Sequence, residues 1–355
     1  MTATDTAHLR TLLTALPKVD LHRHLEGSIR LETLVAVARQ YGLELPAYDV
    51  EGLRSYVQVM PGSPMNATNF LSKFTVLRRF FYSPDVIKRI AREAVEDAAA
   101  DNIKYMELRC TPKALSKLMD FSFDQVVAWV CEAVGEAARF ADIRVRVIIS
   151  MNRHESLLDA ERAVRAAINH LEHGVVAVDL AGQEAGFPAE PFYPLFAQAK
   201  KAGLGITVHA GEWDGPENIR DAIEFMGAQR IGHGVRVIED SRIAQLARET
   251  GLTFEVCPTS NVQSGSVHGM EQHPLRDMIH LGLKSTINTD DPSVSNIKLS
   301  DELVCSIEQL GLTLDEVKRC ILNGAQCAFL PEEERVALVA YFTNALMPIG
   351  QARPQ

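Results

Sequence analysis

The chain has 355 residues, of which 46% are hydrophobic and 23% are charged, and this composition is typical of a globular protein. The formal net charge of -10 argues against a surface that binds nucleic acid. No apolar run approaches the roughly 20 residues that a membrane-spanning helix needs, and the N-terminus lacks the pattern of a signal peptide. Six widely spaced cysteines without a Cys-x-x-Cys pair indicate reduced thiols. We therefore expect a cytoplasmic protein with no membrane or nucleic-acid partner.

The first predicted elements are a short amphipathic helix over residues 7–16, a strand over residues 19–24 and a helix beginning near Leu31. Residues two positions apart in a strand point to the same side. His22 and His24 are therefore predicted to project together.

The segment from about residue 41 to 102 is long for a simple connection between strands. It contains a predicted helix over residues 69–81, in which Phe70, Leu71, Phe74 and Leu77 recur at helical spacing. Such a stripe is explained either by core packing or by an apolar lid over a pocket. The pattern alone favours core packing.

From residue 105 onward, predicted strands alternate with predicted helices. Eight strands are predicted in total, at residues 19–24, 105–109, 144–151, 175–180, 205–208, 230–233, 253–256 and 285–288. The helices after the second strand are predicted at 123–141, 157–173, 191–202, 216–226, 241–250 and 274–281, followed by 300–309, 313–324 and 331–346. Strict alternation predicts a parallel sheet. Eight units predict an α/β fold closed as a (β/α)8 TIM barrel, and an open doubly wound sheet is the alternative.

The domain prediction follows from this pattern. We expect one domain over residues 1–347, with extra helices between the first two strands and at the C-terminus. Residues 348–355 are predicted to form a disordered tail.

Active sites of such barrels lie at the C-terminal ends of the strands, and the unusual polar residues of this chain fall there. Nitrogen and oxygen ligands that together suit zinc come from four of them, His22, His24, His209 and Asp290. A metal at this place lowers the pKa of a bound water towards about 7. Glu212 and His233 are then candidates for proton transfer beside it.

Each of these residues also has a structural explanation. His22 and His24 alone are compatible with structural histidines at a strand end, whose ring nitrogens are satisfied by hydrogen bonds. Glu212 is compatible with a helix cap, and Asp290-Asp291-Pro292 with the start of a helix. The convergence of all these side chains on one barrel mouth favours the metal site.

Several motifs resemble those of the adenosine deaminase family. They are residues 16–27 (LPKVDLHRHLEG), 209–212 (HAGE), 231–234 (IGHG), 257–261 (CPTSN) and 288–292 (NTDDP). Residues 179–186 (DLAGQEAG) resemble the substrate loop of this family. The resemblance covers residues 16–330 in the expected order, and so many motifs together are highly specific.

The resemblance implies a zinc-dependent (β/α)8 barrel that hydrolyses adenosine and deoxyadenosine to inosine and deoxyinosine plus ammonia, in purine metabolism. It implies one Zn2+ per subunit, held by His22, His24, His209 and Asp290. It also implies catalytic roles for Glu212, which protonates purine N1, and for His233, which positions or deprotonates the attacking water. Substrate contacts are implied for His24, Glu26, Gly182 (to N3), Asp291 (to N7) and the apolar gate Phe70 and Leu71. This shifts the explanation of the apolar stripe towards a lid.

One position departs from the adenosine-specific pattern of the family. That pattern has Asp where this chain has Glu26, and adenine-specific relatives commonly carry Glu there. The segment Asp179-Leu-Ala-Gly182, in contrast, resembles the nucleoside-specific branch. Adenosine and deoxyadenosine are the first expectation, and adenine, aminodeoxyfutalosine and methylthioadenosine are the alternatives. Trp213, directly after Glu212, is also unusual and is expected to reshape the pocket.

Two other functional classes remain as alternatives. One is a different amidohydrolase-like hydrolase, which lacks support because no strand-end lysine suggests a bridge between two metals. The other is a catalytically silent nucleoside-binding protein, against which the intact ligand and acid positions argue. The sequence assigns a small-molecule purine nucleoside as partner and no oligomeric state.

Overall fold

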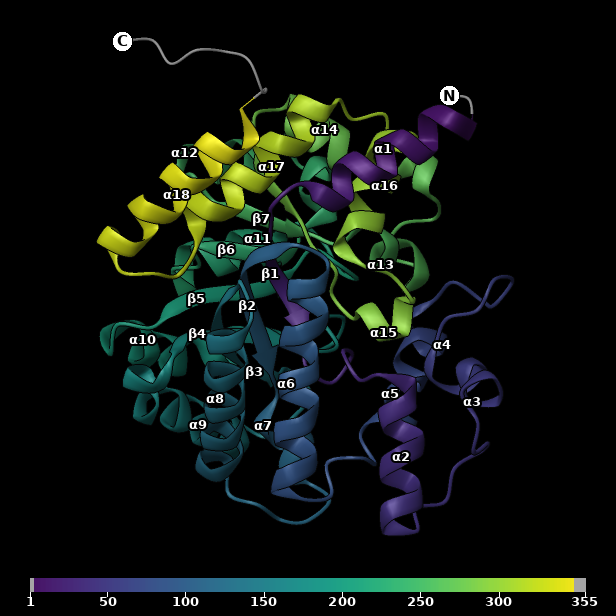
Figure 1. The fold of residues 1–355 in the computed structure, drawn as a ribbon. Coiled ribbons are helices and arrows are strands. Elements are labelled where there is room, and N and C mark those ends of the chain that lie inside the picture. The colour runs from purple at the N-terminus through teal and green to yellow at the C-terminus, as the bar shows by residue number, and fades with distance from the viewer. Residues whose placement is uncertain (1–2, 348–355) are drawn as a thin grey trace.

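The computed structural model describes residues 3–347, and its centre is a barrel of eight parallel strands (Figure 1). The strands are β1 (Lys18–His24), β2 (Ile103–Cys110), β3 (Arg144–Asn152), β4 (Val175–Ala181), β5 (Gly205–Ala210), β6 (Arg230–His233), β7 (Thr253–Val256) and β8 (Lys284–Ile287). They follow one another around the sheet in chain order, and each neighbouring pair is parallel. The predicted (β/α)8 barrel is therefore confirmed, and the open doubly wound sheet is excluded.

The barrel closes between β8 and β1 through residues just beyond β8. The backbone N–H of Asp290 donates to His22 O at 2.7 Å, and the N–H of His24 donates to Asp290 O at 2.8 Å. Arg23 and Asp290 form a parallel bridge at the same point. The closure of the sheet thus places Asp290 directly beside both histidines of β1.

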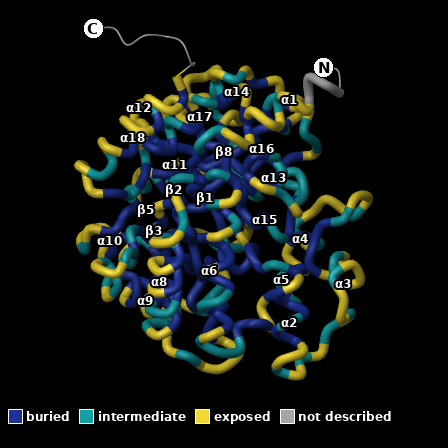
Figure 2. Tube along the Cα trace, viewed as in Figure 1, coloured by how far each residue is buried: buried dark blue, intermediate teal, exposed yellow. Residues whose placement is uncertain are grey.

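Valine and isoleucine are frequent in β3, β4 and β5, as expected for a parallel sheet that is covered on both faces. β5 is buried at every position, and helices of the outer ring bury only their inner side (Figure 2). In α8 (Phe123–Phe140), Val126, Val127, Val130 and Val134 are buried, and a capping box at Ser122 and Gln125 starts the helix. The core therefore lies between the strands and this ring.

The remaining helices mostly occupy the predicted positions. The ring and its additions comprise α1 (Ala3–Ala15), α7 (Pro112–Ser116), α9 (Leu157–Asn169), α10 (Tyr193–Lys201), α11 (Glu217–Asp221), α12 (Ser241–Glu249), α13 (Pro258–Gln263), α14 (Leu275–His280) and α15 (Pro292–Ser295). The predicted helix over 157–173 ends at Asn169, and a 3-10 turn (Leu171–His173) follows. The predicted helix over 216–226 continues from α11 as a π-helical turn (Ala222–Met226).

Between β1 and β2 the chain adds five helices beside the barrel, close to α15 in Figure 1. They are α2 (Leu31–Tyr41), α3 (Val50–Val57), α4 (Ala67–Ser72), α5 (Phe74–Leu77) and α6 (Pro84–Ala100). The predicted continuous helix over 69–81 is wrong. The N–H groups of Lys73 and Val76 bond three residues back instead of four, and the Lys73 side chain turns inward to donate to Ser55 O at 2.9 Å.

Two of the inserted helices, α3 and α6, were not predicted. The sequence of α6 nevertheless holds the usual signals, because Ser83 caps it, Pro84 begins it, and apolar residues recur at helical spacing along its buried face. The predicted extra helices between the first two strands are thus present, in a larger number than expected.

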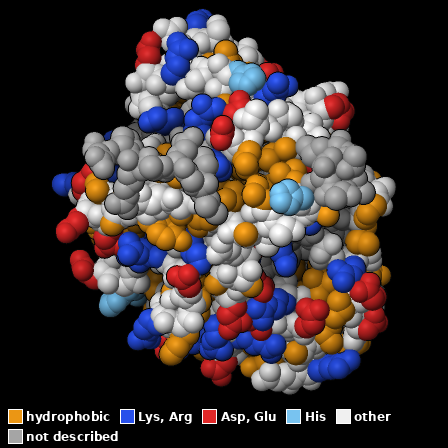
Figure 3. Space-filling model, turned by 45° about the horizontal axis from the view of Figure 1, so that its top comes forward, with side chains coloured by type: hydrophobic (Ala, Val, Ile, Leu, Met, Phe, Trp, Pro, Cys, Tyr) orange, Lys and Arg blue, Asp and Glu red, His pale blue; other side chains and the backbone are white. Residues whose placement is uncertain are grey.

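After α15, three further helices end the described chain, as the sequence predicts, namely α16 (Leu299–Glu308), α17 (Leu314–Cys327) and α18 (Glu332–Leu346). The predicted tail over residues 348–355 lies outside the described residues. Within residues 3–347, no helix combines the length and apolarity that crossing a membrane requires. On the face shown in Figure 3, acidic and basic side chains are interspersed.

Candidate active site

A small cavity of about 90 Å³ lies at the C-terminal ends of the strands. Ten of the predicted site residues line it, namely His24, Glu26, Phe70, Leu71, Gly182, His209, Glu212, His233, Asp290 and Asp291. His22 lies beneath them and is fully buried. A larger hollow of about 990 Å³ surrounds Phe329 at the opposite end of the barrel and is lined by none of these residues. The chemistry therefore converges on the smaller cavity.

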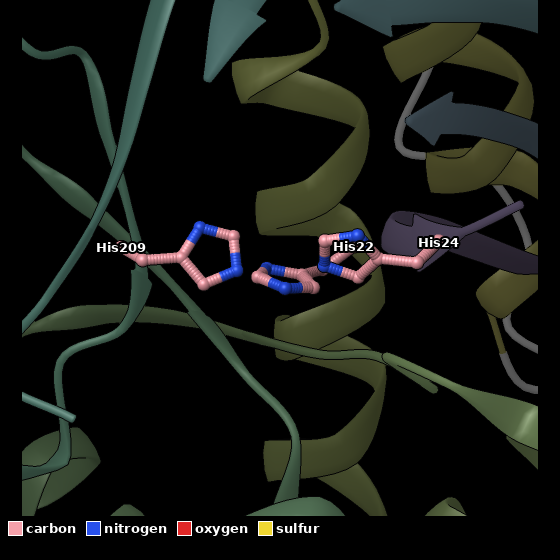
Figure 4. Close-up of side chains that lie close together, drawn as sticks. All are labelled: His22, His24 and His209. Carbon is pink, nitrogen blue, oxygen red and sulfur yellow. The ribbon is translucent and has the colours of Figure 1, made fainter. Parts of the chain in front are cut away.

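The imidazoles of His22, His24 and His209 gather in one place (Figure 4). One nitrogen from each ring lies within 4.8 Å of the other two. Oδ1 of Asp290 is 3.3 Å from Nε2 of His22 and 3.4 Å from Nε2 of His24. The four predicted ligands are thus brought together.

This arrangement fits a metal ion on its own evidence. Nε2 of His22 is buried and has no hydrogen-bond partner of acceptable geometry, which is costly unless another group satisfies it. Cys257 also lies near His22 and Asp290, but burial raises the pKa of its thiol well above the usual value. The three imidazoles and the Asp290 carboxylate are the better donor set for zinc.

Two buried carboxylates orient the ligand histidines. Nδ1 of His22 is 2.9 Å from Oε2 of Glu255, and Nδ1 of His209 is 2.9 Å from Oδ1 of Asp179. Because a carboxylate accepts, we assign the ring proton to Nδ1, which leaves the Nε2 lone pair free for a metal. Arg109 pairs with both carboxylates, at 2.7 Å from Glu255 and 3.2 Å from Asp179.

The same arginine keeps these carboxylates charged. Burial by itself would raise the pKa of Glu255, but Arg109 and Arg230 hold it well below its usual value. Burial likewise opposes ionisation of Asp179, but His209 and Arg109 lower the pKa of that carboxyl.

The ion pairs continue down the barrel from Glu255. Arg230 Nε lies 2.6 Å from Oε1 of Glu255, and Arg230 also pairs with Glu107. Oε1 of Glu107 accepts the backbone N–H of Phe329 at 2.7 Å, and the Arg230 guanidinium stacks on the Phe329 ring, 3.7 Å from its centroid. Charged side chains therefore connect the ligand site with the helices after β8.

Glu212 and His233 face each other in the cavity, with Oε2 and Nε2 3.6 Å apart. The side chain of Asn261 lies 3.0 Å from Nδ1 of His233, and its oxygen lies 3.2 Å from Nε2 of His273. With the Asn261 amide donating to Nδ1, neutral His233 carries its proton on Nε2, towards Glu212. Burial holds the pKa of His233 well below its usual value, so the ring is neutral.

Backbone strain marks the same place. His233 and Asp290 adopt φ values of 60° and 59°, in the left-handed region that non-glycine residues rarely occupy. Such conformations cluster at functional sites. Gly232 is required next to His233, because an added Cβ would lie 2.9 Å from Cε1 of His22. Gly27 is required near Asp291, because its Cβ would lie 1.8 Å from Oδ1 of that residue.

The acids of the cavity differ in charge state. Burial, together with the charges of Asp290, Glu184 and Asp291, raises the pKa of Glu212 well above its usual value. Burial and the charge of Asp290 do the same for Asp291. For Asp290 itself, burial is outweighed by the nearby imidazoles of His22, His233 and His24, and its pKa lies well below the usual value. These shifts favour the protonated form of Glu212 and Asp291 and the ionised form of Asp290.

The predicted lid residues lie on the wall of the cavity. Phe70 is only 3% exposed, whereas Leu71 is 44% exposed. Phe74 and Trp213 line the cavity as well, so the unusual Trp213 does shape the pocket. Glu26 accepts the N–H of Thr111 through Oε1 at 2.6 Å, and its Oε2 is buried without a partner.

Sequence reasoning gave no role to the residues that hold the predicted site residues in place. Charged or polar residues in fully buried strands need partners, and this signal was available for Arg109, Asp179 and Glu255. Ser260 donates to Oδ2 of Asp290 at 2.5 Å. Ser260 and Asn261 thus give a physical role to the segment 257–261, which the sequence identified only as a motif that resembles the family.

Comparison with known proteins agrees with this site. A model of the adenosine deaminase family matches residues 17–344. The adenosine deaminase of Klebsiella pneumoniae (strain 342) is 38% identical over 325 residues, which are 92% of this chain and 97% of that protein.

Two solved structures share the fold. The adenine deaminase of Arthrobacter aurescens has a TM-score of 0.85 at 25% identity and covers 93% of this chain and 99% of its own. An amidohydrolase from Burkholderia ambifaria with bound zinc has a TM-score of 0.87 at 27% identity, over 98% of this chain and 93% of its own. The chain therefore belongs to the adenosine deaminase family and is a hydrolytic deaminase of the metal-dependent amidohydrolase superfamily.

Proposed function

We propose that this enzyme hydrolyses the 6-amino group of adenosine and deoxyadenosine, releasing ammonia and leaving inosine or deoxyinosine. The observation that carries the proposal is one cavity that combines a ligand set of three histidines and one aspartate with a protonated glutamate, Glu212. The 38% identity to an adenosine deaminase supports the nucleoside as substrate.

We propose one Zn2+ per subunit, held by His22, His24, His209 and Asp290. The zinc in the structure of the Burkholderia ambifaria relative supports this choice of metal. When bound, zinc supplies a Lewis acid that generates a nucleophile from water at neutral pH. The remaining chemistry belongs to side chains of this chain.

Glu212 acts as the general acid. Because its pKa is raised, it holds a proton at neutral pH and donates it to purine N1. Protonation of N1 makes C6 electron-poor, so the oxygen of water adds there and C6 becomes tetrahedral. The C6–N6 bond then breaks as the amine takes up one proton of the former water and leaves as ammonia, while the other water proton returns to the Glu212 carboxylate and the C6–O bond becomes a carbonyl. A correctly placed acid contributes typically 10²–10⁴-fold to the rate.

His233 positions the attacking water. It is neutral, its ring is held by Asn261, and Nε2 points towards Glu212 and lies 4.0 Å from Oδ2 of Asp290. A water between these groups has a fixed orientation towards C6. With its proton on Nε2, His233 donates to the oxygen of that water and so holds it in place.

The remaining residues position the purine. Protonated Asp291 donates to N7, and the backbone N–H of Gly182 donates to N3. Phe70 and Leu71 cover the ring and exclude water from it, which strengthens the polar contacts beneath. His24 and Glu26 line the wall on which the ribose would lie.

Adenine is the second candidate substrate, on a specific observation. Glu26 is a glutamate where the adenosine-specific pattern has aspartate, and an adenine deaminase has a closely similar fold. Aminodeoxyfutalosine and methylthioadenosine are further aminopurines that this pocket chemistry suits.

A substrate panel tests the proposal. Purified zinc-loaded enzyme is assayed for ammonia release from adenosine, deoxyadenosine, adenine and 5′-modified adenosines. We expect the highest kcat/KM for adenosine and deoxyadenosine. Preference for adenine would overturn the nucleoside assignment, and nucleoside binding without ammonia release would identify a catalytically silent binding protein. We also place the enzyme in purine metabolism, because its proposed substrates are purine nucleosides. We place it in the cytoplasm because its six cysteines are free thiols.

A further inference from the structure

Glu184 lies in the loop after β4 and reaches across to the loop after β5. Its carboxylate accepts four consecutive backbone N–H groups. Oε1 accepts from Gly211 at 2.6 Å, and Oε2 accepts from Glu212, Trp213 and Asp214 at 3.0, 3.0 and 3.1 Å. Glu184 is only 3% exposed. Burial raises the pKa of Glu184, and Arg153 and these N–H groups oppose that rise; because every one of the four backbone partners is a donor, both oxygens of Glu184 act as acceptors.

A second buried side chain links the same two loops. Arg153, directly after β3, donates through Nη2 to His209 O at 2.6 Å and through Nη1 to Phe187 O at 3.4 Å. Arg153 is 3% exposed. The segments 183–187 and 209–214 are therefore held together by two buried groups of opposite charge.

The linked loops carry the two contacts that would hold the six-membered ring of a purine. Gly182, two residues before Glu184, would contact N3. Glu212, whose own N–H is bound by Glu184, would protonate N1. N1 and N3 have a fixed separation in the ring, so both loops must keep a fixed separation too.

We propose that Glu184 is a positioning residue that sets the distance between the Gly182 loop and the Glu212 loop and so aligns Glu212 with purine N1. This inference rests on the proposed function for the role of N1 and N3. A misplacement of about 1 Å costs roughly 10²-fold in rate, and Glu184 would act by preventing it.

The first test is hydrogen exchange of the backbone amides of residues 211–214 by mass spectrometry, with the full chain loaded with zinc. Glu184→Gln keeps the shape of the side chain but turns one acceptor oxygen into an amide that meets N–H donors. We expect these amides to exchange at least about 10-fold faster in this variant, because buried hydrogen bonds determine local protection.

Asp101→Asn is the matched control. Asp101 is also buried, and its carboxylate accepts the backbone N–H of Ser300 at 2.9 Å, at the N-terminal end of β2. We expect this variant to lose a similar hydrogen bond without changing the exchange of residues 211–214 or kcat.

The second test is steady-state kinetics with adenosine and measurement of bound zinc. We expect Glu184→Gln to lower kcat about 10- to 100-fold, with KM and zinc content little changed. Glu184→Asp keeps the charge with a shorter reach, and we expect an intermediate kcat. This variant also serves if Glu184→Gln fails to fold.

The possible outcomes distinguish the link between the loops, the positioning role and the proposed function. Unchanged exchange in Glu184→Gln overturns the link between the loops. Faster exchange with wild-type kcat overturns the positioning role, and a fall in kcat that follows zinc loss shows an effect through His209 instead. If the wild-type chain deaminates no aminopurine, the proposed function fails and the positioning role fails with it, while the exchange result still decides whether Glu184 fixes the loop.

Discussion

Nδ1 of His22, in β1, lies 2.9 Å from Oε2 of Glu255, in β7, and both side chains are fully buried. The two strands are not neighbours in the sheet, so this contact crosses the interior of the barrel. Arg109 holds Glu255 from a third strand. The orientation of a candidate metal ligand is thus set by strands distant in sequence, which makes the metal site sensitive to substitutions that touch no metal.

Arg109→Met is expected to weaken zinc binding about 10- to 100-fold, because partners of ligand residues have effects of this size. Competition with a chromophoric chelator measures the affinity. Arg230→Met is the comparison variant and should weaken zinc binding less, because Arg230 pairs with Glu255 but not with Asp179. Equal loss of affinity in both variants would point to general destabilisation. Arg109→Lys keeps the positive charge but lacks the planar guanidinium that pairs with both carboxylates, so its zinc affinity should lie between those of the wild type and Arg109→Met.

Glu212→Gln is expected to reduce kcat about 10²- to 10⁴-fold, because the amide cannot give a proton to N1. Zinc content should stay at the wild-type level, since Glu212 is not among the ligands. Ammonia release and metal analysis on the same sample check both statements. Wild-type turnover in this variant would remove Glu212 from the acid role.

Phe70→Ala is expected to raise KM for adenosine about 10-fold, because a buried aromatic wall of the cavity is lost. Leu71→Ala is the comparison variant and should change KM less, since Leu71 is 44% exposed. Initial rates over a range of adenosine concentrations give both values. A larger effect at Leu71 would mean that the lid closes further over the substrate than the structure shows.

Glu26→Asp is expected to change the ratio of kcat/KM for adenosine and adenine by about 10-fold, with zinc affinity unchanged. The shorter side chain withdraws the buried Oε2 atom that has no partner, and an unsatisfied polar group discriminates strongly between substrates. Equal changes for both substrates would refute a Glu26 that faces the ribose.

The stability of the protein should fall as the pH rises from about 4.5 to 8 because of Glu302. Burial raises the pKa of this glutamate from 4.5 to about 8. The folded chain therefore keeps a proton that the unfolded chain has lost, and the free energy of unfolding falls by up to about 1.4 kcal/mol per pH unit in this window.

Glu302→Gln isolates that contribution. Its amide oxygen can still accept the N–H of Thr259, which lies 3.1 Å from Oε1 of Glu302. Urea unfolding at pH 5, 6.5 and 8 should show an advantage of the variant over the wild type that grows with pH. A constant difference between the two proteins would assign the pH dependence to other groups.

Much of the fold follows from local patterns. The apolar strands alternate with helices at regular intervals, and burial on both faces of a parallel sheet leaves a signal that needs no alignment. The helices inserted between β1 and β2 were harder to predict from local patterns, because they pack against the side of the barrel and against one another. Lys73 illustrates the difficulty, since its inward contact with Ser55 O breaks a helix that periodicity alone continues.

The candidate site was likewise predictable only in part. His22, His24, His209 and Asp290 stand at strand ends, where the barrel geometry predicts convergence. The partners of these residues were not predictable from strand position, because Glu255, Asp179 and Arg109 act through contacts that only the packed barrel creates. Their burial with charge was visible in the sequence, but the identity of each partner was not.

Phe329, Arg230 and Glu107 pack against one another between the active-site cavity and the hollow at the opposite end of the barrel. Substrate and product must then use the same opening, beneath α4 and α5. One molecule has to leave before the next can enter, so product still bound in the cavity delays the arrival of the next substrate. The turnover of the enzyme is thereby tied to how fast this shared opening clears, and not only to the chemical step.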